Sequence, residues 1–135
     1  MQYQEYIQEV ELITNHIKEA KYNEALDALF QLLLSDISDI DKAALCTQLA
    51  GLFDRLRNQK EALAYFDKGI SFEQNWYRYE VTEKKAQYLS QLGRSDQAVP
   101  IYESLIKQPF ISESEKDRMR KTLQTFLRKT MGNWQ

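Results

Sequence analysis

Three stretches of the chain repeat one another, and this repetition constrains the fold more than any other feature of the sequence. The stretches are KYNEALDALFQLL from Lys21, NQKEALAYFDKGI from Asn58 and GRSDQAVPIYESLI from Gly93. Each contains an alanine that is followed four residues later by a large apolar residue, on the same face of a helix. From Ala25 to Ala62 is 37 residues, and from Ala62 to Ala98 is 36. The sequence therefore predicts three equivalent helices in a regular array.

A further helix is predicted before each of these stretches, because apolar residues recur there at helical spacing. They are Leu12, Ile13 and Ile17 before the first stretch, Leu45, Leu49, Leu52 and Phe53 before the second, and Val81, Ala86, Leu89 and Leu92 before the third. Gly93 then suits the left-handed residue that closes a helix. Helix, short turn and helix are thus expected three times in succession.

This pattern resembles the tetratricopeptide family, whose repeats span ~34 residues. The middle copy carries the resemblance best, with large, small and aromatic residues at the family's positions: Leu49, Ala50, Phe53, Ala62, Phe66 and Gly69. Two family features are missing. The first aromatic position holds Glu9, Cys46 and Thr82 in the three copies, and the first two copies lack the closing proline.

The resemblance implies an all-α fold, a right-handed α-solenoid of three helix-turn-helix repeats with a capping helix, about seven helices in total. We expect residues 1–135 to form a single domain. The predicted bounds are residues 6–39, 43–76 and 79–111 for the repeats and 113–131 for the capping helix. Pro100 is expected near the end of the first turn of the sixth helix, where a missing N–H is tolerated.

The capping helix is predicted from a start signal and an apolar face. Ser112 followed by Glu115 forms a capping box. Beyond it, apolar residues recur along one helical face: Met119, Leu123, Phe126, Leu127 and Met131. A helix of this kind would close the open apolar end of the stacked repeats.

Composition argues against several classes of partner. The formal net charge of −2 gives no overall attraction to nucleic acid or to an anionic membrane. The basic residues between Arg118 and Lys129 are interpreted as a solvated face near a helix C-terminus, so no nucleic-acid partner is expected. No membrane partner is expected either, because neither a signal peptide nor a spanning segment is apparent. One cysteine excludes an internal disulfide, and we expect a cytoplasmic protein.

Catalysis is not expected, because the residue types that it requires are scarce. His16 is the one histidine and Cys46 the one cysteine. We interpret His16 as an imidazole packed between helices and Cys46 as a small buried hydrophobe. Phosphate-loop, metal-ligand and nucleophile motifs are absent from the sequence, so no catalytic residue, metal site or cofactor is predicted.

The resemblance also implies where a partner would bind. In tetratricopeptide proteins the first helix of each pair lines a concave groove for a peptide or a partner helix. The corresponding positions are Ile7, Val10, Thr14 and Ile17, then Ala44, Thr47, Gln48, Gly51 and Arg55, and finally Glu80, Glu83, Lys84 and Gln87.

One family ligand is argued against. A subfamily grips the C-terminal carboxylate of chaperones with two asparagines and three basic residues, and those positions here hold Val10, Thr14, Gln48, Glu80 and Lys84. Only Lys84 retains the chemistry, and Glu80 would repel a carboxylate. A chaperone tail is therefore not the expected ligand.

Two functional hypotheses remain open at this point. The first is a non-catalytic interaction module or adaptor that binds a protein of unknown identity in the groove. The alternative is self-association, for instance as a homodimer, without a separate ligand. The aromatic residues Trp76, Tyr77 and Tyr79 are expected mainly to fill the seam between the second and third repeats, and form a secondary candidate binding patch.

Overall fold

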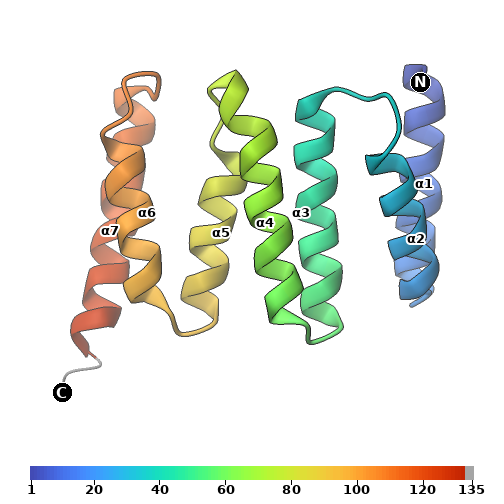
Figure 1. The fold of residues 1–135 in the computed structure, drawn as a ribbon. Helices are drawn as coiled ribbons and strands as arrows, with labels where there is room; N and C mark the ends of the chain where they lie inside the picture. Colours follow the sequence, from blue (N-terminus) through green and yellow to red (C-terminus); the bar gives the residue numbers. More distant parts are fainter. Residues whose placement is uncertain (133–135) are drawn as a thin grey trace. The chain divides into compact units, whose positions relative to one another are not determined.

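The structure, a computed structural model that describes residues 1–132, consists of helices (Figure 1). No strand occurs in that range. The described residues form seven α-helices and one short 3₁₀ helix: α1 (Tyr3–Lys18), α2 (Tyr22–Leu33), α3 (Asp39–Arg55), α4 (Gln59–Glu73), η1 (Gln74–Trp76), α5 (Glu80–Gln91), α6 (Ser95–Ile106) and α7 (Glu113–Gly132). The predicted all-α class is confirmed.

The first six α-helices form three antiparallel pairs, each joined by a turn of three residues (Figure 1). The turns are residues 19–21, 56–58 and 92–94. The residue in the middle of each turn has a positive φ: 59° at Ala20, 60° at Arg57 and 78° at Gly93. The expectation that Gly93 closes its helix is confirmed.

The same hydrogen bond closes all three turns. The residue after the left-handed position donates its N–H to the carbonyl five residues earlier, from Lys21 to His16, from Asn58 to Phe53 and from Arg94 to Leu89, each at 2.8 Å. This is the bond of a Schellman motif, which satisfies carbonyls that the helix end leaves free. From Ala20 to Arg57 is 37 residues and from Arg57 to Gly93 is 36, so the turns recur with the interval of the aligned alanines.

The chain divides into two compact units, the first ending at Trp76 and the second beginning at Tyr77. This division falls between the predicted second and third repeats. The first unit contains two helix pairs, and the second contains one helix pair followed by α7.

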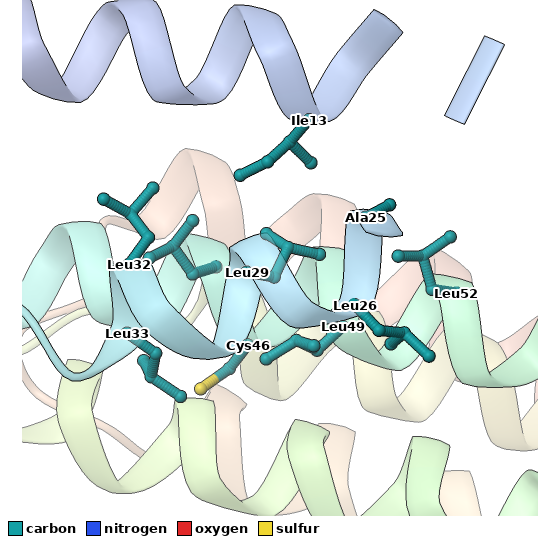
Figure 2. Close-up of a cluster of buried hydrophobic side chains, with 10 residues drawn as sticks. Ile13, Ala25, Leu26, Leu29, Leu32, Leu33, Cys46, Leu49 and Leu52 are labelled. Carbon is teal, nitrogen blue, oxygen red and sulfur yellow. The ribbon is translucent and has the colours of Figure 1, made fainter. Parts of the chain in front are cut away.

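The core of the first unit lies between α1, α2 and α3. Figure 2 shows Ile13 projecting from α1 toward α2, with Leu29 of α2 and Leu49 of α3 in the same cluster. These three side chains are fully buried, and burial of such a side chain contributes about 1.5–3 kcal/mol. Stacked rings of Phe53 and Tyr65, with centroids 5.5 Å apart, extend the packing to α4.

The core of the second unit is built around α6, which packs against both α5 and α7. Tyr102 is fully buried, and its ring meets Phe126 of α7 edge to face, at 5.4 Å between centroids. Met119 of α7 is also fully buried. The expected packing of α7 against the preceding helix pair is therefore present within this unit.

The start of α7 agrees with the predicted N-cap. The Glu115 N–H donates to the Ser112 hydroxyl at 3.2 Å. The Glu115 carboxylate pairs with Arg118, at 2.7 Å, rather than returning to Ser112. Ser112 thus caps the helix, while Glu115 serves a different contact.

Two local predictions were wrong. Pro100 lies inside α6, beyond its first turn, on the exposed side of a helix that continues to Ile106. The predicted apolar face of α7 is also only partly covered, because Leu127 and Met131 are 39% and 69% exposed. Helical spacing predicts which residues share a face but not how far a neighbour extends along it.

Candidate functional site

The candidate site begins with an exposed face on α3. Ala44, Gly51 and Arg55 are exposed, and Thr47 and Gln48 are half-buried beside them. Spacings of three, four and seven residues place all five on one side of the helix. The Thr47 hydroxyl donates back to the Ala43 carbonyl at 3.4 Å, so it makes a bond within its own helix.

Gly51 lies near the middle of this face and has no packing role in the free chain. A Cβ atom built at Gly51 would meet nothing within 4 Å. A glycine inside a helix is less favourable than alanine by roughly 0.5–1 kcal/mol. The fold therefore gives no reason for a glycine here, and the space above its Cα is open.

The candidate residues of α1 divide into two groups. Ile7 and Thr14 are exposed, and the Thr14 hydroxyl donates to the Val10 carbonyl at 2.9 Å. Val10 and Ile17 are half-buried because they pack against the core cluster of the first unit. Only the first group is exposed.

A shallow depression lies where the N-terminal parts of α1 and α3 approach one another. Its volume is about 340 Å³. It is lined by Met1, Tyr3, Tyr6, Asp36, Ile37, Ser38 and Asp41. None of these was a predicted site residue. Burial raises the pKa of the Tyr6 hydroxyl, and the nearby Asp41 carboxylate raises it further.

The candidate residues of α5 belong to the second unit. Glu80, Lys84 and Gln87 are all exposed, and Glu80 lies 3.7 Å from Arg78. Glu83 is different: it is buried at 8% exposure and faces inward. Its place in the predicted groove was therefore wrong.

Glu83 belongs to a polar network that sequence reasoning missed. Arg118 of α7 binds both carboxylate oxygens of Glu83, and the Tyr102 hydroxyl donates to the same carboxylate at 2.8 Å. Arg118 also pairs with Glu115, to which the Tyr79 hydroxyl donates at 3.3 Å. The network therefore joins α5, α6 and α7 through a charge-assisted fork of the type that arginine forms with carboxylates.

The pKa values of three members of the network are shifted, each toward keeping the ordinary form of the group. Burial is the main cause that raises the pKa of Tyr102, followed by its bond to Glu83. The bonds to Glu83 and Glu115 raise the pKa of Arg118, and the bond to Arg118 lowers the pKa of Glu115. Tyr102 thus stays neutral and Arg118 and Glu115 stay charged near neutral pH, so these three groups hold helices together rather than exchange protons.

The secondary aromatic patch is divided between the two units. Trp76 donates its indole N–H to Asp39 at 3.2 Å in the first unit. Tyr77 and Tyr79 pack on Phe110 in the second, with ring centroids 5.5 and 6.5 Å away. Trp76 and Tyr77 are 58% and 71% exposed, whereas Tyr79 is half-buried.

The remaining chemistry-bearing residues show no reactive arrangement. Cys46 is fully buried, as predicted, and burial raises the pKa of its thiol to about 11. His16 is half-buried. Within residues 1–132, no group of histidine, cysteine and carboxylate side chains could hold a metal ion. No helix in that range is both long and apolar enough to cross a membrane.

Comparison of the sequence with protein-family models and with curated proteins gives no match. The tetratricopeptide resemblance therefore depends on the residue pattern itself. The repeated turns and helix pairs described above are compatible with that pattern.

Proposed function

We propose that this chain is a non-catalytic interaction module that binds a peptide or a helix of a partner protein on the exposed face of its first helices. The central element is the α3 face with Ala44, Gly51 and Arg55. Ile7 and Thr14 of α1 contribute in the same unit, and Lys84 and Gln87 of α5 contribute from the second unit.

The observation that carries the proposal is the open space at Gly51. A helix-interior glycine that no neighbour requires makes the free protein less stable. Such a residue is explained when another backbone or a bulky side chain must approach the helix closely. Ala44, two turns before Gly51, is also small and exposed, which extends the low surface along α3.

The chemistry of the face favours a ligand with both apolar and polar groups. Ile7 offers an aliphatic contact, Gln48 offers a donor and an acceptor, and Arg55 offers a cation. Binding in a helix-lined groove uses apolar anchors at a few positions and polar contacts that fix orientation.

We further propose that the three helix pairs stack as a right-handed solenoid, with α7 as its cap.

The test uses two substitutions at one position. Gly51→Arg places a long charged side chain in the open space, whereas Gly51→Ala adds only a methyl group. Both should fold, and both should melt at or above the wild-type temperature, since each replaces glycine with a better helix former. Gly51→Arg should lose partner capture from lysate, and Gly51→Ala should keep most of it.

A third variant controls for the added charge. Ala64 is exposed on α4 and lies outside the candidate face, so Ala64→Arg should retain the captured partner. Equal capture by wild type and Gly51→Arg would refute the proposed face. Loss of capture by Ala64→Arg as well would show that the effect is one of charge and not of place.

A further inference from the structure

The two units carry opposite net charge. Residues 1–76 contain 13 acidic and 7 basic side chains, a net charge of −6, while residues 77–135 contain 7 and 11, a net charge of +4. Stretches of two helices contribute to this difference. Between Tyr3 and Leu12, α1 has three acids and no base, and from Arg118 to Met131, α7 has five bases and no acid.

The exposed side of α7 combines apolar and basic residues in one stripe. Leu127 and Met131 lie four residues apart and are exposed, and Gln124 precedes them on the same side. Lys121 and Arg128 border the stripe. Both are exposed, and neither forms an ion pair with any residue that the structure describes.

The exposed side of α1 is the chemical complement of that stripe. Tyr3 and Ile7 are 75% and 36% exposed, and Glu11 follows at the same four-residue spacing. Glu5 is also exposed, but it lies two residues from both Tyr3 and Ile7 and therefore on the far side of the helix. Glu11 has no cationic partner in the described part of the chain. An apolar pair followed by one unpaired acid is thus available at the start of the chain.

The two stripes match in length when the helices are antiparallel. Tyr3 to Glu11 spans eight residues and Met131 to Lys121 spans ten, or about 12 and 15 Å at 1.5 Å per residue. With Ile7 opposite Leu127 and Tyr3 opposite Met131, Glu11 comes opposite the Lys121 end of α7. In the parallel arrangement that keeps the apolar pairs in contact, Tyr3 lies opposite Leu127 and Ile7 opposite Met131, and Glu11 then lies beyond Met131 and away from Lys121. The antiparallel arrangement is therefore the one that pairs Glu11 with a base of the stripe.

We propose that α1 of one copy of this chain docks antiparallel on α7 of a second copy, through these two stripes. The contact is heterologous, because the two surfaces differ, so it produces rings or open chains rather than a closed twofold dimer. Its apolar part is small, and the pairing of Glu11 with the Lys121 end of α7 gives it orientation and salt dependence. This contact goes beyond the proposed partner binding: it shares Ile7 with that surface but does not use the α3 face.

The first experiment measures the mass of the full chain in solution by sedimentation or light scattering. The average mass of the wild type should rise above the 16.0 kDa of one chain as concentration increases at low salt. It should fall back as salt is raised toward about 1 M, where the Debye length is about 3 Å. A wild type that stays at the mass of one chain over all concentrations overturns the proposal.

The second experiment identifies the surfaces by mixing variants. Ile7→Lys opposes the basic stripe and Leu127→Asp opposes the acidic one, so each variant alone should remain monomeric. Their equimolar mixture should associate, because each supplies the surface that the other lacks. Asn23→Lys, at an exposed position of α2, adds the same charge elsewhere and should behave as wild type.

A second pair of variants reverses the charges at two exposed positions, and it tests the same contact if Ile7→Lys or Leu127→Asp folds poorly. Glu11→Lys and Lys121→Glu should each weaken association, and the double variant should restore it. If Ile7→Lys dissociates the protein while Leu127→Asp does not, the contact joins two copies of α1 and the proposal is wrong. Loss of association in the double variant would overturn it as well.

Discussion

Replacement by glycine should stabilise the protein in two of the repeated turns and destabilise it inside a helix. Ala20 and Arg57 have φ values of 59° and 60°, where a side chain is disfavoured by about 1–2 kcal/mol. Glycine removes that strain but gives the unfolded chain more freedom, at about 0.5–1 kcal/mol. Ala20→Gly and Arg57→Gly should therefore each stabilise the protein by about 0.5–1 kcal/mol.

Two control substitutions should have the opposite effect and lower the stability of the protein. Ala64→Gly makes the same change inside α4 and should destabilise by about 1 kcal/mol, because no positive φ is relieved there. Gly93→Ala reverses the same balance and should destabilise by about 0.5–1 kcal/mol from the backbone alone, since a Cβ at Gly93 would meet nothing within 4 Å.

The assay is urea unfolding followed by circular dichroism. With a slope of about 1–3 kcal/mol per molar urea, each change should move the midpoint by a few tenths of a molar or more. Ala20 and Arg57 lie in the first unit and Gly93 in the second, so separate transitions would shift separately if the units unfold in turn. Destabilisation by Ala20→Gly comparable to that by Ala64→Gly would refute the reasoning.

Three further predictions concern packing and chemistry. Ala62→Leu should destabilise by about 1–3 kcal/mol in thermal unfolding and Ala64→Leu by much less, because Ala62 is fully buried and Ala64 is exposed; equal melting temperatures would contradict this. Arg118→Met should cost about 1.5–3 kcal/mol by leaving the Glu83 carboxylate without its cation, and adding Glu83→Gln should recover part of the loss. Because burial raises the pKa of the Cys46 thiol to about 11, iodoacetamide at pH 8 should label it only when the protein unfolds, and labelling at the rate of a free thiol would contradict the buried placement.

Features that depend on neighbours in sequence could be predicted. Helical spacing gave the six paired helices and α7, and Ser112 marked the start of α7. Gly93 was recognised as a helix end because glycine has a residue-specific preference for positive φ. Ala20 and Arg57 have no such preference and were missed. The repeat could have found them, since each of the three residues lies five positions before the aligned alanine of its stretch.

Features that depend on distant residues could not be predicted. Glu83 was placed in the groove because its spacing fits the open side of its helix, yet it is bound by Arg118, which lies 35 residues later. Val10 and Ile17 show the same limit, because their spacing suits both an open face and a core face, and the structure packs them on the core. Periodicity determines which residues lie together on a helix, while tertiary contacts determine whether another element covers them.

The basic residues of α7 show how one helix can have two roles without conflict. Arg118 lies on the side that meets α5, where Glu83 and Glu115 neutralise it, so it contributes to holding the second unit together and not to its surface charge. Lys121 and Arg128 lie on another side, where no described acid neutralises them. A substitution at Arg118 should therefore change unfolding, whereas one at Lys121 should change association alone. Because the two functions occupy different sides of the helix, stability and assembly can be altered independently.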